Sequence, residues 1–231
     1  VDGIHFDDYF YPYPSYNGDK DFPDDKSWTA YLNSGGTLSR GDWRRDGVNK
    51  LIERLYAEIK QEKKHVKFGL SPFGIWRPGY PATVTGFDAY NGLYADARKW
   101  LQEGWLDYFS PQLYWPVQQR GQEYPVLLRW WSEQNAYGRH LWPGNFTSKV
   151  GDASRTGWRS EEIEQQIRMT RPVVHQARLH HPGHGIHAPV QKCQLQPRAK
   201  THARLARIPG CQQYQIRHIA GRQQPRPHPG P

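Results

Sequence analysis

Cysteine is scarce in this chain, with two residues among 231. Two cysteines are too few for a disulfide scaffold, and Cys193 and Cys211 lack the C-x-x-C spacing of a metal or redox site. The absence of any run of about 18 apolar residues argues against a membrane-spanning helix. Neither GxGxxG nor GxxxxGK[ST] is present, so the sequence predicts no nucleotide site and no cofactor.

Acidic residues are missing from the last quarter of the chain. Residues 171–231 contain ten Lys and Arg, eight of the 11 His and nine of the 19 Pro, but no Asp, Glu, Trp or Phe. Residues 1–170 hold the other 21 basic and all 22 acidic residues, so the formal charge of +9 arises from the C-terminal part. We therefore expect a folded part, 1–170, and a tail of unrelated composition, 171–231.

Three interpretations of this tail differ in what they predict. It could be a disordered basic segment, a nucleic-acid-binding arm, or a segment translated out of frame. We favour the last, because a loss of acidic residues with a gain of Arg, His, Pro and Gln is typical of GC-rich DNA read out of frame. We accordingly expect no nucleic-acid partner. We expect no metal either, because the tail offers no packed second shell for its clustered histidines, His180, His181, His184 and His187.

Short strands alternate with amphipathic helices in residues 1–170. Strands are expected at 1–6, 66–70, 106–114 and 140–146. Helices are expected around 93–102, from Pro125 and from Ser160, and also where apolar residues recur with helical spacing at Val48, Leu51, Ile52, Leu55 and Ile59. Four such βα units predict an α/β fold with a parallel sheet.

The strand ends point to a particular α/β fold. Each expected strand ends in polar and aromatic residues, the pattern of a (β/α)8 TIM barrel with its site at the C-terminal rim. A complete barrel has eight strands in roughly 250 residues, and four are recognisable here. The sequence therefore predicts about half of a TIM barrel, in residues 1–170.

The first strand carries the strongest chemical signal, in the segment GIHFDDY. Because side chains alternate along a strand, His5 and Asp7 share one face while Ile4 and Phe6 share the other. Asp7 would then point to the barrel rim, where catalytic groups lie. Asp8 follows at the strand end, and we take both Asp7 and Asp8 as candidate catalytic residues. The alternative is structural, with Asp8 capping the next loop and His5 bonded inside the barrel.

Three tryptophans at strand ends could form stacking surfaces for sugar rings. They are Trp76, Trp115 and Trp142, whereas Trp100, Trp130 and Trp131 have helical spacing and are expected in the core. The third strand places Ser110, Gln112 and Tyr114 on one face, opposite the apolar residues Phe109, Pro111 and Leu113. Such a polar face suits a hydroxylated ligand. The alternative for the three rim tryptophans is again the core.

Carboxylates, indoles and a polar rim together suggest glycoside hydrolysis. That reaction needs a carboxylic acid and a second carboxylate, about 5–5.5 or 6.5–9.5 Å apart. Adjacent Asp7 and Asp8 cannot be assumed to form that pair on a regular strand. The partner is expected to be Asp88, Asp96 or a residue in the missing half of the barrel.

Several long motifs resemble the glycosyl-hydrolase-like 10 family: VDGIHFDDYFYPYP, FGLSPFGIWRPG, LYADARKWLQEGWLDYFSPQLYWP and RHLWPGNFTSKV. The resemblance covers residues 1–170 and implies a (β/α)8 barrel in which these motifs form the fourth to seventh strands. It also implies a periplasmic or extracellular enzyme of the cell envelope, which hydrolyses peptidoglycan glycan strands lacking stem peptides. With two further motif residues, Tyr9 and Asn145, the substrate-binding candidates are His5, Tyr9, Trp76, Gln112, Tyr114, Trp115, Trp142 and Asn145.

The chain also departs from this family pattern. Strands one to three are absent, and after IEQQIRMTR the segment PVVHQARLHH replaces the eighth-strand motif. We therefore expect a truncated member of the family, in which the activity of the fragment is open. The competing functional hypothesis is a catalytically inactive barrel that binds carbohydrate.

Overall fold

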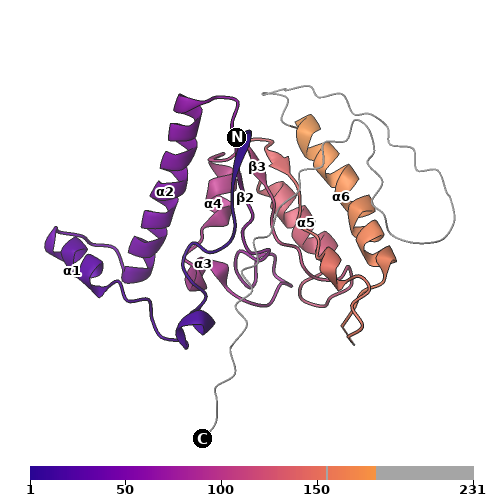
Figure 1. The fold of residues 1–231 in the computed structure, drawn as a ribbon, viewed down its shortest axis with the longest axis horizontal. Helices are drawn as coiled ribbons and strands as arrows, with labels where there is room; N and C mark the ends of the chain where they lie inside the picture. Colours follow the sequence, from indigo (N-terminus) through magenta and orange to yellow (C-terminus); the bar gives the residue numbers. More distant parts are fainter. Residues whose placement is uncertain (155, 181–231) are drawn as a thin grey trace, which may run out of the picture. The chain divides into compact units, whose positions relative to one another are not determined.

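The computed structural model describes residues 1–154 and 156–180 (Figure 1). The strands in this part of the chain are β1 (Gly3–Phe6), β2 (Lys67–Leu70), β3 (Tyr108–Phe109) and β4 (His140–Leu141). Its helices are α1 (Asp25–Asn33), α2 (Arg40–Glu62), α3 (Ala89–Gly92), α4 (Ala97–Gln102), α5 (Tyr124–Glu133) and α6 (Ser160–His180), with short 3-10 helices η1 (Pro14–Asn17) and η2 (Thr147–Lys149). None of these helices is long and apolar enough to cross a membrane.

The four strands form one parallel sheet in the order β1-β2-β3-β4, which confirms the predicted α/β fold. Each strand pairs with the strand before it in the sequence. One row of Cα partners passes through His5, Gly69, Tyr108 and His140, and the next through Phe6, Leu70, Phe109 and Leu141. β3 and β4 are shorter than predicted, but isolated parallel bridges from Gln112 to Phe73 and to Gly144 continue the pairing beyond them.

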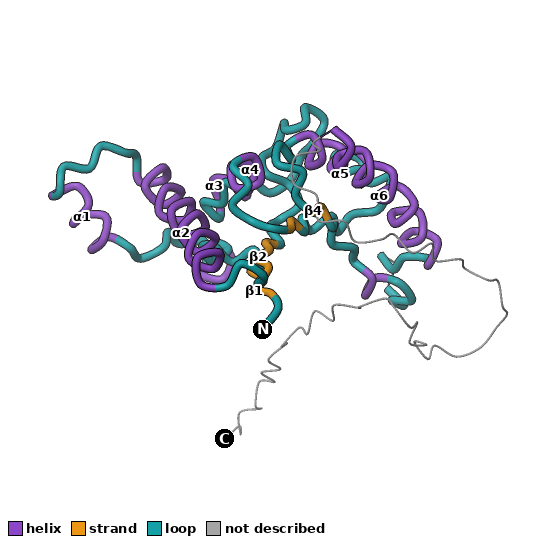
Figure 2. The backbone as a smooth tube through the Cα atoms, turned by 90° about the horizontal axis from the view of Figure 1, so that it is seen from above, coloured by secondary structure: helices purple, strands orange, loops and turns teal. Residues whose placement is uncertain are grey.

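One face of the sheet packs against helices. Leu70, Phe109 and Leu141 are at most 1% exposed, and Ile4 and Phe6 pack against the same core, as the alternation predicts. Figure 2 shows α2, α4, α5 and α6 in an arc on one side of the strands. The predicted core indoles are buried too, with Trp100, Trp130 and Trp131 at most 9% exposed.

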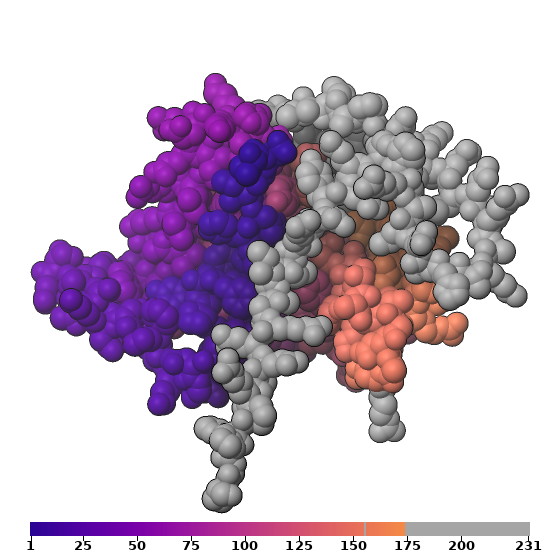
Figure 3. All heavy atoms as spheres, viewed as in Figure 1, coloured from indigo at the N-terminus to yellow at the C-terminus, as the bar shows by residue number. Residues whose placement is uncertain are grey.

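The opposite face carries an aromatic row instead of an apolar core. The rings of His5 and Tyr108 stack at 5.6 Å, and the Tyr108 ring lies 5.1 Å from that of Trp142. Gly69 makes this row possible, because a Cβ there would lie 1.9 Å from Cζ of Tyr108. His5 is exposed, and Figure 3 shows β1, in dark indigo, at the surface. This face is therefore open around β1.

Three sequence predictions need correction. The stretch between β1 and α2, for which the sequence indicated neither helix nor strand, contains η1 and α1, and α1 buries none of its residues. Leu51 is 50% exposed, because the buried stripe of α2 runs through Val48 and Ile52. Helix α6 continues to His180, past the change in composition near Arg171. Residues 181–231, including His181, His184 and His187, lie outside the described residues, as does the His180 side chain.

Candidate functional site

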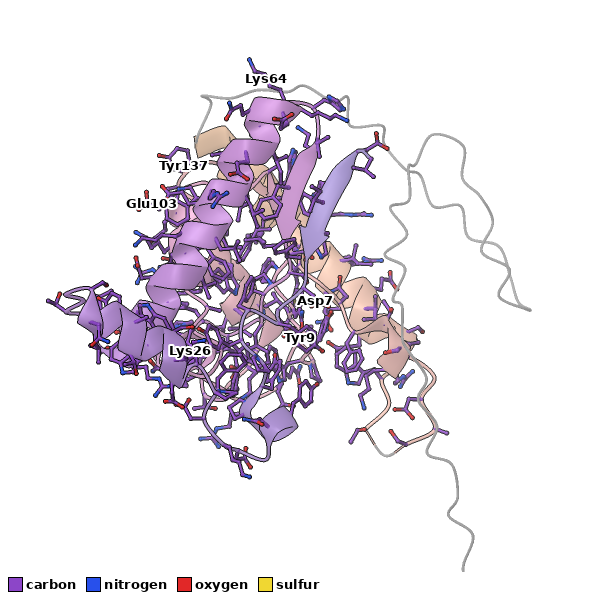
Figure 4. The ribbon with its side chains drawn as sticks, turned by 60° about the vertical axis from the view of Figure 1, so that its left-hand side comes forward. Asp7, Tyr9, Lys26, Lys64, Glu103 and Tyr137 are labelled. Carbon is purple, nitrogen blue, oxygen red and sulfur yellow. The ribbon has the colours of Figure 1, made fainter. Side chains whose placement is uncertain are left out.

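Polar side chains gather beyond the C-terminal end of β1, where parallel sheets place their functional groups. Asp7 follows the last residue of β1 directly and is exposed (Figure 4). Its Oδ1 accepts a 2.8 Å hydrogen bond from Nε2 of Gln112 and a 2.9 Å bond from the backbone N–H of Asp8. Gln112 also donates to the carbonyl of Ser71, at 2.9 Å. Gln112 thus links the Asp7 carboxylate to the ends of β2 and β3, while the carboxylate remains exposed.

Asp8 has a different environment from Asp7. It is 5% exposed, and its Oδ2 accepts a hydrogen bond from the Tyr13 hydroxyl. Burial raises the pKa of Asp8, and the charge of Asp7 adds to this, whereas the bond from Tyr13 opposes it. The Asp7 carboxyl is therefore open to solvent, whereas the Asp8 carboxyl is enclosed and its pKa is raised.

These carboxyl groups also affect the pKa values of Tyr114 and His5. Burial raises the pKa of Tyr114, and the negative charges of Asp7 and Asp8 raise it further. Desolvation lowers the pKa of His5 below 6.5, with the charge of Asp7 opposing the shift. Nδ1 of His5 lies 3.0 Å from the Tyr108 hydroxyl. The site at neutral pH therefore has a neutral phenol beside Asp7, and its imidazole is biased towards the neutral form.

The structure separates the three rim tryptophans. Trp76 is 8% exposed, its ring stacks on Trp130 at 6.0 Å, and its Nε1 donates to Asp96. It is a core residue, because the loop after β2 folds back onto α5. Trp115 is half-buried and packs edge-on against Phe73. Trp142 is 46% exposed and offers the most open indole of the three.

The remaining candidate binding residues also differ in how exposed their side chains are. Tyr9 is 58% exposed and lies beside Asp7 in Figure 4. Tyr114 is half-buried, and its ring packs against Phe146. Asn145 is engaged internally, because its Nδ2 donates to Oε1 of the fully buried Gln166 at 2.8 Å. Asn145 therefore ties the loop after β4 to α6, which is a structural role that the motif alone did not reveal.

Asp88 and Asp96, the candidates for the second carboxylate, lie at the N-terminal ends of helices. Asp88 accepts from the backbone N–H of Asn91 and caps α3. Asp96 accepts from the backbone N–H of Lys99 and caps α4. Both carboxylates serve the local helix ends, so the structure assigns them capping roles.

Sequence reasoning missed Tyr13, which bonds directly to Asp8. It also missed the anchor of the loop that carries Tyr13. The Arg44 guanidinium, 3% exposed, donates to Asp21 and Asp24 in that loop and to the Tyr94 hydroxyl. No sequence feature indicated the contact of Tyr13 with Asp8.

Fold and site together define a class of protein. It is an α/β protein in which carboxyl groups and aromatic side chains gather beyond the C-terminal ends of parallel strands, where α/β enzymes place their active sites. Residues 1–158 match the glycosyl hydrolase-like 10 family, and the chain belongs to this family.

Curated relatives agree with this assignment. The chain is 39% identical to "Glycosyl hydrolase YngK" of Bacillus subtilis (strain 168) over 178 residues, which cover 74% of this chain and 34% of the relative. It is 37% identical to "Glycosyl hydrolase DigH" of Escherichia coli (strain K12) over 160 residues, which cover 67% of this chain and 35% of the relative. The chain thus spans about a third of the length of these relatives.

Proposed function

We propose that this chain is the part of a glycoside hydrolase that carries a reacting carboxylate, Asp7. The observation that supports this most directly is the placement of Asp7, exposed at the end of β1 and held by Gln112. The substrate would be a polysaccharide, and specifically peptidoglycan glycan strands without stem peptides. The parent protein would then act in the cell envelope, in the periplasm or outside the cell. The reaction would need no cofactor.

We further propose that the sheet is half of a (β/α)8 barrel. Four parallel strands in sequential order, with helices on one side, are what half of such a barrel would contain. The aromatic row of His5, Tyr108 and Trp142 would then be a layer of the barrel interior. The other strands would come from a part of the parent protein that this chain does not include.

The two carboxyl groups at the end of β1 would have different roles in the reaction. Asp7 is exposed, whereas Asp8 is 5% exposed and its carboxyl is engaged by the Tyr13 hydroxyl. Asp7 would therefore react, and Asp8 would modulate its charge. The second reacting carboxylate would belong to the missing half of the barrel.

A chimera tests this proposal. Residues 1–158 would replace the matching segment of the Bacillus subtilis relative, which restores a full-length protein. We expect Asp7→Asn in this chimera to lower kcat on peptide-free glycan strands by at least about 100-fold with little change in KM, because the amide keeps the shape but cannot transfer a proton. Asp19→Asn is the matched control, because Asp19 is an exposed loop residue with φ of 57°, which Asn also tolerates. Retention of more than about a tenth of kcat by Asp7→Asn would exclude this role.

A non-catalytic carbohydrate-binding function is the second candidate. It is favoured by the exposed indole of Trp142, since a pyranose ring can stack on such a surface. It predicts that the chimera binds glycan strands but hydrolyses none, with or without Asp7→Asn. Turnover by the unmutated chimera would exclude it.

A further inference from the structure

The turn that follows Asp7 encloses Asp8. β1 ends at Phe6, so Asp7 and Asp8 leave the sheet on different sides, one towards solvent and one into the loop of residues 9–24. There the Tyr13 hydroxyl donates to Oδ2 of Asp8. The Tyr13 ring also packs against Phe87, with centroids 5.3 Å apart. Tyr13 is therefore fixed both by its hydroxyl and by its ring.

The loop that supplies Tyr13 is itself tied down at its far end. Arg44 donates to Oδ2 of Asp24 at 2.8 Å and to Oδ1 of Asp21 at 2.7 Å. The side chains of Arg44 and Asp24 are 2% and 8% exposed. The Tyr11 hydroxyl, two residues before Tyr13, bonds to the same Asp24 at 3.4 Å. These bonds hold the loop against α2, and the position of Tyr13 follows from them.

We propose that Tyr13 is a positioning residue that fixes Asp8, whose backbone N–H holds the Asp7 carboxylate, and so acts on the reacting carboxylate through Asp8. This inference rests on the proposed role of Asp7. Its physical basis is a series of hydrogen bonds: the Tyr13 hydroxyl donates to the Asp8 carboxyl, and the backbone N–H of Asp8 and the Gln112 amide both donate to Oδ1 of Asp7.

The charged and titratable groups around Asp8 determine whether Tyr13 raises or lowers the pKa of Asp8. They are Asp7 at the strand end, Tyr9 and Tyr13 in the loop, and Tyr114 beyond β3. Burial and the charge of Asp7 favour the protonated form of Asp8. The bond from Tyr13 favours the ionised form. The Tyr13 hydroxyl therefore lowers the pKa of Asp8.

The test is the titration of Asp8 in the whole 231-residue chain, followed by NMR of 13C-labelled aspartate carboxyls. Tyr13→Phe keeps the ring and removes the hydroxyl, so we expect the pKa of Asp8 to rise by about one pH unit or more. Tyr16→Phe is the matched control, because the Tyr16 ring packs against Tyr13 with centroids 5.8 Å apart, while its hydroxyl is not among the groups that shift the pKa of Asp8. We expect that variant to leave Asp8 unchanged.

The pH dependence of the unfolding free energy gives a second measure of the pKa of Asp8. The unfolding free energy of the chain should fall as pH rises through the titration range of Asp8, since its folded pKa is raised, and Tyr13→Phe should extend that fall to higher pH. An Asp8 titration that is unchanged by Tyr13→Phe, or equally changed by Tyr16→Phe, would overturn the inference.

Activity separates this inference from the proposed function. In the chimera, Tyr13→Phe should shift the pH profile of kcat and leave KM within about twofold, as expected for a residue that acts on protonation and not on binding. If the chimera hydrolyses nothing, the proposed function fails while the titration still decides whether Tyr13 controls Asp8. If hydrolysis is present but its pH profile does not move, the positioning role fails and the role of Asp7 stands.

Discussion

Removal of the Arg44 side chain should be among the most costly single changes in this chain. Arg44 and Asp24 are almost completely buried, and the guanidinium makes two hydrogen bonds to the carboxylate, both 2.8 Å. Loss of one partner of a buried ion pair typically costs about 3–5 kcal/mol. Arg40 still donates to Asp24 in the variant. We therefore expect Arg44→Ala to lower the unfolding free energy by about 3 kcal/mol at neutral pH.

The same pair predicts how this loss depends on pH. Burial opposes ionisation of Asp24, but the hydrogen bonds from Arg44 and Arg40 outweigh it and lower its pKa from 3.8 to about 2. A depressed carboxyl pKa stabilises the fold above the unfolded-state pKa, and that stability is lost as pH falls through the folded-state pKa. A shift of this size corresponds to about 2 kcal/mol. The difference between wild type and Arg44→Ala should therefore shrink between about pH 4 and pH 2.

Urea unfolding followed by tryptophan fluorescence measures both effects. Arg54→Ala provides a matched control on the same helix, because Arg54 pairs with Glu58 at the surface, where the side chains are 77% and 53% exposed. That variant should unfold close to wild type at both pH values. If the two variants have equal midpoints, or if the Arg44→Ala difference is as large at pH 2.5 as at pH 7, the buried pair does not anchor the loop.

Two further predictions concern the open face of the sheet. Gly69→Ala should destabilise the chain by about 1–3 kcal/mol in the same unfolding assay, because the new Cβ displaces the Tyr108 ring. An unchanged midpoint would show that the Tyr108 ring does not depend on the absence of a side chain at residue 69. His5 should titrate below 6.5 by 15N NMR, and Asp7→Asn should lower that pKa further, because it removes the charge that favours the imidazolium. A His5 pKa that rises in Asp7→Asn would contradict this arrangement.

The sheet could be predicted from the sequence because its signals are local. Strict alternation placed Phe6 on the helix side of β1 and His5 and Asp7 on the other, and helical spacing placed Trp100 and Trp131 in the core. These patterns depend on periodicity along a single element, which the sequence records directly.

The contacts of the loops could not be predicted in the same way. Trp76 follows a strand end, as a rim residue should, yet the β2–α3 loop carries it onto Trp130. Asn145 lies in a family motif, but Gln166 in α6 engages its amide. The surroundings of Asp8 depend on Tyr13, in a loop that α2 anchors. Such contacts join distant segments, and no periodic pattern along the chain encodes them.

The sequential order of the strands has a consequence for how the sheet forms. β2 pairs with β1, β3 with β2, and β4 with β3, so no strand has to insert between two that are already paired. Each new strand pairs with the strand made before it, but only after the intervening helices have been made, because partners such as His5 and Gly69 are far apart in the sequence. A sheet of this kind can grow as the chain leaves the ribosome, and strands added at either edge would leave the existing register unchanged.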